Sequence, residues 1–307
     1  MLQTVFRPND RIGMEYLALA IAAVGHAFWD NALVWMVKID PDASILHLHW
    51  LRMLFMTVCL FAGSLRQKTP EKQPLWWLKF SFVGWVIPSI MYTLSVLWEG
   101  YRISVSFQTF IPLVVIFRTK TQLTEWKCFS ITLAMCGTLV IWSSVNWKSE
   151  LWAVWASIGA SIAHVFASAE FFVMLYSVKK NKFRAVTIGA IGGQGILFML
   201  MALFVHPSYL FITAAKNMKT WLAVLCACAV TAGVKFWLMA RFSSIMKPDG
   251  LAIFECIHPI ATLTSDILWE RDYLAPQDSI AILFFLFGWF LYPKNEYIGG
   301  GPQYQNV

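Results

Sequence analysis

The chain has 307 residues, of which 58% are hydrophobic and only 13% are charged, and its formal net charge is +7. A soluble domain carries roughly 25% charged residues, so this composition predicts a membrane protein and excludes a soluble nucleic-acid-binding domain. The six cysteines include no CxxC pair and no Cys/His spacing typical of a metal site. We expect them to be small buried apolar residues, without a disulfide framework, a metal or a cofactor.

Ten apolar stretches come near the length of about 20 residues that a helix needs to cross a bilayer, although the fourth and the tenth are short. They are 14–37, 44–65, 75–98, 103–117, 128–145, 151–178, 185–205, 220–243, 250–268 and 279–292. The fold expected is therefore an all-α membrane protein with ten transmembrane helices. The polar, Gly-rich end at 294–307 is expected to be a disordered cytoplasmic tail.

Basic residues are unevenly divided between the two sides of this layout. Of the 24 Lys and Arg residues, sixteen lie on the side of the N-terminus, six lie on the other side, and Arg52 and Lys235 lie inside helices. Lys and Arg are held in cytoplasmic loops, so the bias predicts that both termini are cytoplasmic. It does not decide between the plasma membrane and an endomembrane.

Two stretches, ISVSFQTFIPLVVIFRTKT at 103–121 and GLAIFECIHPIATLTSDILW at 250–269, resemble each other. When Pro112 is aligned with Pro259, Gln108 meets Glu255. Each stretch is thus an apolar helix broken by a proline, with a polar side chain one turn before the break. Two such helices in corresponding halves of a membrane chain indicate a transporter binding site.

The first and sixth segments also match, since GHAFWDNALVWM at 25–36 aligns with AHVFASAEFFVM at 163–174 and His26 meets His164. Each half would hold five helices, an odd number, so the second half enters the membrane in the opposite orientation. We therefore expect two inverted five-helix repeats, 1–148 and 149–293, around a central cavity.

Several short motifs resemble the EamA branch of the drug/metabolite transporter superfamily. In the first half they are HWLRMLFM with Arg52, FVGWVIPSIMY, the proline of the fourth segment, QLTEWK and AMCGTLVIW. The second half has the matching proline, LWERDYL and FLFGWFLY. VSFQTFIP has a weaker resemblance to the nucleotide-sugar and triose-phosphate translocators. The resemblance implies a ten-helix bundle with a central cavity and transport by exchange or proton coupling. Arg52 is expected mainly to tie helices together.

Polar groups buried in the bilayer are costly and mark pathways or binding sites. Glu255 and His258 share a helix face, and Lys235 could neutralise Glu255 or bind an anion. His26 and Asp30 lie one turn apart and could exchange a proton. Trp237 lies deep in its segment and is expected to line the central cavity. The candidate substrate-binding residues are His26, Trp29, Asp30, Tyr92, Gln108, His164, Lys235, Glu255 and His258.

The sequence thus predicts a secondary transporter of a small polar organic metabolite, either an amino acid or an amine-like compound. A nucleotide-sugar or sugar-phosphate antiporter is the second reading, favoured by Lys235, Arg118 and Lys120. A non-transporting receptor or scaffold is the third. No GxSxG, HExxH or phosphate-loop motif is present, so an enzyme is not expected. The expected partners are a small-molecule substrate and the lipid bilayer, and a homodimer is left open.

Overall fold

The computed structural model describes residues 10–39, 45–99, 101–144, 151–204, 218–269 and 275–293. Most of the residues in these ranges are helical, and the ranges contain no strand. The helices are α1 (Asp10–Ile39), α2 (Ile45–Ser64), α3 (Pro74–Ser81), α4 (Ile87–Glu99), α5 (Tyr101–Phe107), α6 (Ile111–Thr119), α7 (Glu125–Ser143), α8 (Leu151–Tyr176), α9 (Lys182–Phe204), α10 (Met218–Phe242), α11 (Pro248–Ala252), α12 (Ile257–Trp269) and α13 (Pro276–Leu291). All ten predicted segments are helical, with ends within four residues of the prediction. The predicted tail at 294–307 lies outside the described residues.

Local sequence explains where these helices begin and end. Pro74, Pro248 and Pro276 stand in the first turn of α3, α11 and α13, where the missing N–H costs no hydrogen bond. The Thr124 hydroxyl accepts the Lys127 backbone N–H and caps α7. Lys120 ends α6 in the left-handed conformation with φ 53°.

Three helical stretches change their hydrogen-bond pattern midway. A π-helical turn, η2 (Phe82–Val86), joins α3 to α4. A 3₁₀ turn, η3 (Gln108–Phe110), joins α5 to α6, and another, η5 (Ile253–Cys256), joins α11 to α12. The prediction of two broken helices is therefore confirmed.

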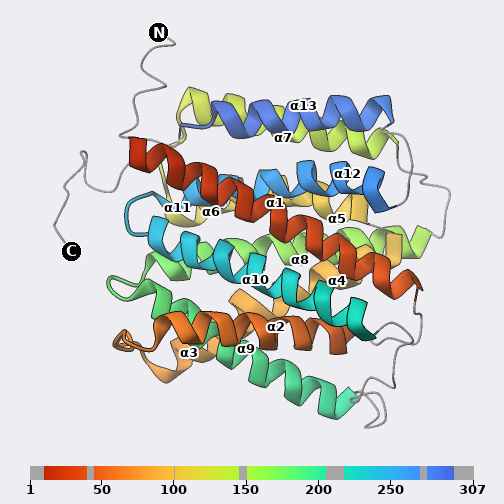
Figure 1. Ribbon diagram of the computed structural model, residues 1–307. Helices are drawn as coiled ribbons and strands as arrows, with labels where there is room; N and C mark the ends of the chain where they lie inside the picture. The colour runs from red at the N-terminus through yellow and green to blue at the C-terminus, as the bar shows by residue number, and fades with distance from the viewer. Residues whose placement is uncertain are drawn as a thin grey trace.

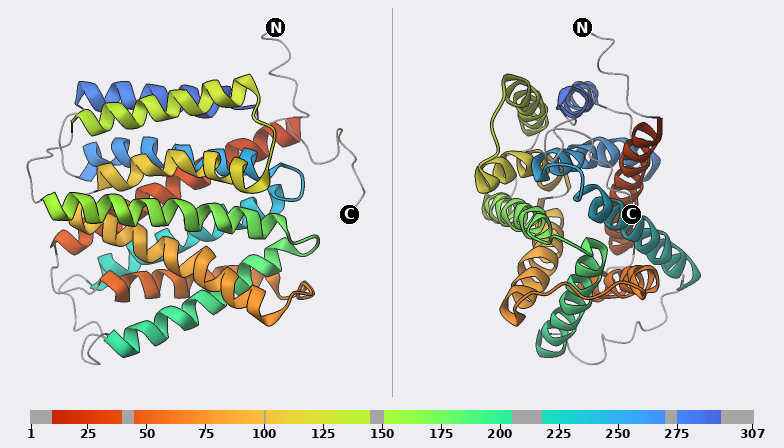
Figure 2. Two further views of the ribbon diagram at one scale, coloured as in Figure 1. Left: turned by 180° about the vertical axis from the view of Figure 1, so that it is seen from behind. Right: turned by 90° about the vertical axis from the view of Figure 1, so that its left-hand side faces the viewer.

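The two helices broken by 3₁₀ turns run antiparallel to each other. α5 packs against α12, α6 packs against α11, and η3 contacts η5. The breaks thus meet near the middle of the bundle, while α7 and α13 form a separate pair at the top of Figure 1. Seen along the helices, the two broken helices lie side by side, with α7 and α13 above them and α8 below α5 and α6 (Figure 2, right).

The outside of the bundle is apolar. Within the described residues, four helical stretches are long and apolar enough to cross a membrane: Glu125–Ser143, Trp152–Tyr176, Lys182–Leu203 and Leu222–Phe242. Large apolar side chains on several helices are exposed, and those of Leu203 and Phe117 are among the most exposed. Such an extended apolar exterior is consistent with a membrane protein.

Two expectations about burial were wrong. Cys59 and Cys128 are exposed, although all six cysteines are free thiols as expected. Trp237 is 42% exposed and does not line the cavity described below. The reason is physical: a helix in lipid can present apolar side chains on every face, so apolar character does not reveal which face is buried.

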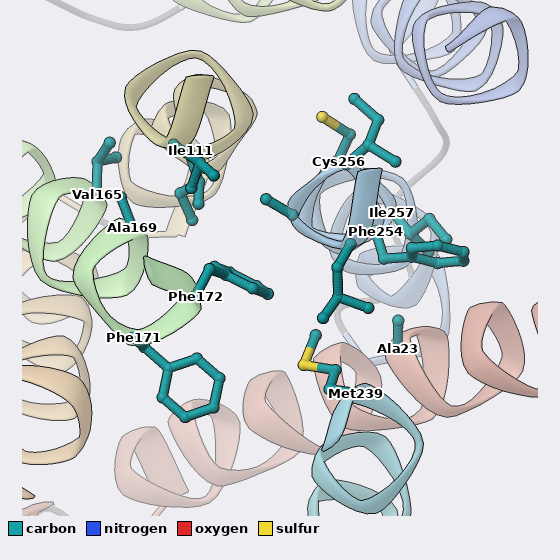
Figure 3. Close-up of a cluster of buried hydrophobic side chains, with 14 of the residues drawn as sticks. Ala23, Ile111, Val165, Ala169, Phe171, Phe172, Met239, Phe254, Cys256 and Ile257 are labelled. Atoms are coloured by element: carbon teal, nitrogen blue, oxygen red, sulfur yellow. The ribbon is translucent and has the colours of Figure 1, made fainter. Parts of the chain in front are cut away.

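Side chains from several helices close the core around the broken segments. Figure 3 shows Ile111 of α6, Phe172 of α8 and Met239 of α10 pointing toward the turn that carries Phe254 and Cys256. This packing fixes the position of the 3₁₀ turns, and the cavity lies beside them.

Candidate functional site

A single cavity draws its lining from both halves of the chain. The space open to the centres of water-sized molecules is about 110 Å³. The lining residues are His26, Arg52, Met53, Met56, Gly84, Trp85, Pro88, Ser89, Tyr92, Gln108, His164, Ser168, Phe171, Phe172, Lys235, Phe236, Met239, Glu255 and His258. Its wall is therefore partly charged and partly aromatic.

The two 3₁₀ turns position a polar residue each. Pro112 has no N–H to give the Gln108 carbonyl, and Pro259 has none for the Glu255 carbonyl, because a helical N–H bonds four residues back. The helix instead narrows to a 3₁₀ turn, in which the Ile111 N–H donates to the Gln108 carbonyl. The sequence thus forces Gln108 and Glu255 into the two breaks, where both line the cavity.

Glu255 and Lys235 form an ion pair at the cavity wall. Lys235 Nζ lies 2.9 Å from Glu255 Oε1 and 3.0 Å from Oε2, so both carboxylate oxygens are engaged. The Lys235 side chain is 4% exposed and the Glu255 side chain is 11% exposed. The attraction between the two charges offsets part of the cost of removing them from water.

Three histidines and Tyr92 form a connected group. His258 Nε2 lies 3.3 Å from the Tyr92 hydroxyl, and the His258 ring stands edge-on to His26 with centroids 5.9 Å apart. His164 Nδ1 lies 2.9 Å from the Pro88 carbonyl. A carbonyl can only accept, so Nδ1 carries a proton and Nε2 of His164 is left as the acceptor in the neutral ring.

Arg52 also lines the cavity, although it was not among the substrate-binding residues predicted from the sequence. Its Nη2 lies 3.1 Å from Nδ1 and 3.3 Å from Nε2 of His26, which places the guanidinium against the imidazole ring. The contact does tie α2 to α1, as expected, but Arg52 also lines the cavity. A charged residue within an apolar segment is the signal that could have identified it.

Gln108 brings a polar atom that the protein leaves unsatisfied. The residue is 2% exposed, and its side-chain oxygen is buried without a hydrogen-bond partner. Such a group costs about 1–3 kcal/mol unless a partner is supplied. A bound molecule with an N–H or O–H group would supply one.

Aromatic side chains form another part of the wall. The ring centroids of Trp85 and Phe236 are 4.6 Å apart, and Phe171 lies 5.5 Å from Trp85 and 5.6 Å from Phe236. Trp85 belongs to the π turn η2, a type of distortion often found at functional sites. This wall can contact the apolar body of a ligand.

Seven of the nine predicted site residues line this one cavity: His26, Tyr92, Gln108, His164, Lys235, Glu255 and His258. Trp29 and Asp30 belong to α1, but their side chains lie outside the described residues. Among the side chains that the structure describes, no group of three or more His, Cys, Asp or Glu residues could hold a metal ion.

No protein-family model and no curated protein matches this sequence. A solved structure described as "Crystal structure of protein" is similar in fold, with a TM-score of 0.69 and 10% sequence identity. The similarity covers 92% of this chain and 97% of that one. At this identity it establishes a shared fold alone.

Proposed function

We propose that this chain is a secondary transporter that moves a small polar organic metabolite across a membrane by alternating access. The observation that carries the proposal is the cavity at the crossing of the two broken helices, where Gln108, Glu255 and Lys235 are buried inside an apolar bundle. Transporter binding sites are built in this way from discontinuous helices near the bilayer midplane.

Helix contacts support two inverted repeats and ten membrane spans. α1 packs against α10, and its counterpart in the second half, α8, packs against α4. The remaining counterparts, α2 with α9 and α7 with α13, contact each other directly. This pattern is expected of a bundle with two-fold pseudosymmetry, in which each of the first five segments has a counterpart with equivalent helix contacts among the last five.

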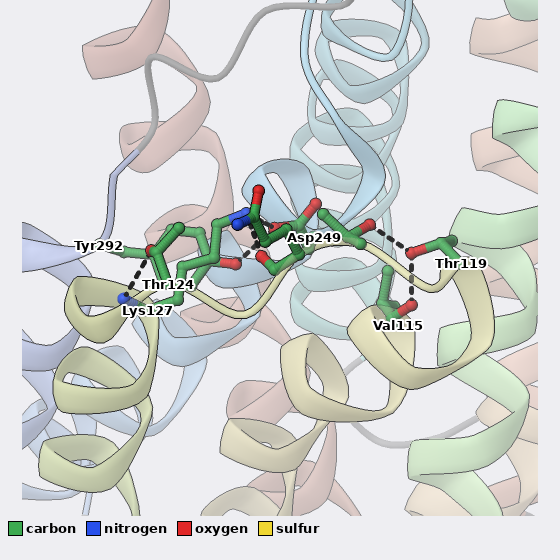
Figure 4. A network of polar contacts seen from close by, with 8 residues as sticks. Val115, Thr119, Thr124, Lys127, Asp249 and Tyr292 are labelled. Atoms are coloured by element: carbon green, nitrogen blue, oxygen red, sulfur yellow. Dashed lines mark hydrogen bonds and ion pairs between the residues drawn. The ribbon is translucent and has the colours of Figure 1, made fainter.

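Two ion pairs join corresponding positions of the two halves and support the same two-fold relationship. Arg102 and Asp249 each stand ten residues before the proline of their broken helix, and Lys127 and Asp278 are each the third residue of α7 and α13. Lys127 pairs with Asp249 at 2.8 Å, and Arg102 pairs with Asp278 at 3.0 Å. α11 and α5 begin at opposite ends of the bundle in Figure 1, so one pair lies at each end. Figure 4 shows the network around Lys127 and Asp249.

Cavity size favours a small metabolite over a nucleotide sugar. Pockets for drug-sized ligands span about 300–1,000 Å³, well above the 110 Å³ found here. A receptor or scaffold, the other alternative, has no need for buried charges around a cavity. The short motifs that resemble the drug/metabolite transporter superfamily support the same proposal, and the excess of Lys and Arg on one side favours cytoplasmic termini.

Flux through reconstituted protein tests the proposal. Proteoliposomes containing the purified chain are offered labelled amino acids, monocarboxylates, amines, sugar phosphates and UDP-glucose. At least one small metabolite should accumulate saturably, and Glu255→Gln, compared at equal amounts of folded protein, should abolish that uptake. If folded wild-type protein moves none of them, the proposal is wrong. Saturable flux of UDP-glucose alone would favour the nucleotide-sugar alternative.

A further inference from the structure

Two segments at one end of the bundle are strongly basic. Residues 65–73 connect α2 to α3, and residues 177–184 connect α8 to α9 and form the first turn of α9. The structure describes every residue of both segments. Together they hold one acidic residue, Glu71, and seven basic ones: Arg66, Lys68, Lys72, Lys179, Lys180, Lys182 and Arg184. Like charges repel, so this concentration of cations favours an anionic partner.

Hydrogen bonds hold the two segments against each other. Lys72 Nζ donates to the Ser177 carbonyl at 3.0 Å, and the Arg184 backbone N–H donates to Gln67 Oε1 at 3.2 Å. Arg184 Nη1 also donates to the Ser64 hydroxyl at 3.1 Å. In Figure 1 the two connections lie side by side at the left-hand end of the bundle. The basic surface is therefore preformed, and both halves of the chain contribute to it.

Four of the seven cations remain available to a ligand. Arg66, Lys68, Lys179 and Lys180 are exposed, and none of them forms an ion pair or a hydrogen bond with the part of the chain that the structure describes. The other three already donate hydrogen bonds within the bundle. The four available cations form a basic patch, with two residues from each segment.

Exposed apolar side chains border the basic patch. Phe61 and Leu65, at the end of α2, are 42% and 60% exposed. Leu75 and Leu78, in α3, are 72% and 57% exposed. Trp76 lies between them in the sequence and is half-buried, and tryptophan is enriched where a bilayer meets water. The patch therefore lies where apolar surface gives way to charge, at the level expected for lipid headgroups.

We propose that the basic patch binds the headgroup phosphate of an anionic phospholipid, whose acyl chains lie along the exposed apolar residues of α2 and α3. Lys and Arg bind phosphate oxygens through charge-assisted hydrogen bonds. A soluble phosphate would meet the same cations but gain nothing from the apolar residues beside them, so the surface fits a lipid better. No residue of the patch lines the cavity, so this site does not depend on the proposed transport function.

The position of the patch also predicts what a bound lipid does. Lys179 and Lys180 belong to the second half of the chain, whereas Arg66 and Lys68 belong to the first. A headgroup that contacts both segments joins the two halves at this end of the bundle. Because such a ligand binds the folded protein and not the unfolded chain, it should raise the apparent thermal stability.

Thermal stability of the purified chain in detergent tests the proposal. The additions are phosphatidylglycerol, phosphatidylcholine, which has no net charge, and glycerol 3-phosphate, which has no acyl chains. Phosphatidylglycerol should stabilise more than phosphatidylcholine, and glycerol 3-phosphate should not stabilise at the same concentration. The preference for phosphatidylglycerol should fall as salt is raised to about 1 M, where the Debye length is only about 3 Å. This salt dependence tests the wild-type protein directly and requires no variant.

Charge removal locates the site. Lys179→Gln with Lys180→Gln, and Arg66→Gln with Lys68→Gln, should each weaken the binding of phosphatidylglycerol about fivefold to thirtyfold, because each basic residue near an anionic lipid contributes about fivefold in affinity. The response to phosphatidylcholine should not change. All four side chains are exposed, so these variants should fold. Titration with phosphatidylglycerol, read by native mass spectrometry of the protein–lipid complex, gives the affinities.

Lys120→Gln with Lys219→Gln is the matched control, because it removes the same charge from exposed positions outside the two segments. It should keep the preference for phosphatidylglycerol. The proposal is overturned if phosphatidylcholine stabilises as strongly, if the variant lacking all four patch cations keeps the preference, or if the control loses it equally. Stabilisation by glycerol 3-phosphate alone would identify a site for soluble anions and would also overturn the assignment to lipid.

Discussion

Lys127 and Asp249 form an ion pair that is almost completely buried, with Nζ 2.8 Å from Oδ2 and each side chain 1% exposed. The Tyr292 hydroxyl donates to the same Oδ2 at 2.6 Å. Three helical elements, α7, α11 and the end of α13, are thereby joined at one end of the bundle (Figure 4). A second ion pair, Arg102 with Asp278, is less protected, because the Arg102 side chain is 35% exposed, whereas that of Asp278 is 6% exposed.

Removing one partner from the buried pair should be strongly destabilising. Lys127→Met leaves the Asp249 carboxylate buried without its cation, at a cost of about 3–5 kcal/mol. Arg102→Met should cost less, because Arg102 is 35% exposed and solvent screens its side of the pair, but it still leaves an Asp278 carboxylate that is only 6% exposed. Unfolding of the purified variants in detergent measures both values. Equal losses in the two variants would show that burial does not distinguish the pairs.

Two glycines offer a matched test of helix packing. A Cβ at Gly288 would lie 2.9 Å from the Ser130 carbonyl oxygen and 3.1 Å from the Ala134 backbone N, where neither neighbour is the end of a flexible side chain. Gly288→Ala should therefore destabilise the α7–α13 pair by about 1–3 kcal/mol. A Cβ at Gly195 meets nothing within 4 Å, so Gly195→Ala should stabilise by about 0.5–1 kcal/mol. A similar shift in thermal stability for both would contradict this packing.

The sequence predicted the parts of the site that local chemistry determines. Pro112 and Pro259 each remove a backbone donor, so the breaks at Gln108 and Glu255 could be foreseen. The contact between Arg52 and His26 could not, because it depends on how α2 packs against α1. The pairing of Lys127 with Asp249 was missed for the same reason, since their helices are distant in the chain. Trp237 was misplaced because apolar residues face both lipid and core.

The pair of Lys235 and Glu255 allows a structural role to be separated from a functional one. Glu255→Gln alone leaves a buried ammonium, which should lower stability by about 3–5 kcal/mol. Lys235→Met combined with Glu255→Met should recover most of that loss, because well-packed apolar residues can replace a buried pair. Uptake should stay at background in both variants. Restored uptake in the double variant would mean that the pair serves folding alone.

The two end pairs should control opposite faces of the cavity. Ser168 lines the cavity, so Ser168→Cys, in a variant whose native cysteines are replaced, reports access to a membrane-impermeant thiol reagent. Asp249→Asn weakens the closure beside α11 and should raise labelling from that side of the membrane. Asp278→Asn weakens the closure beside α5 and should raise labelling from the other side. Each change can shift the balance between conformations only by the free energy with which its pair favours one of them. The Arg102–Asp278 pair should therefore give the smaller effect, because its Arg102 side chain is 35% exposed. Increased labelling from the same side in both variants would contradict alternating access through this cavity.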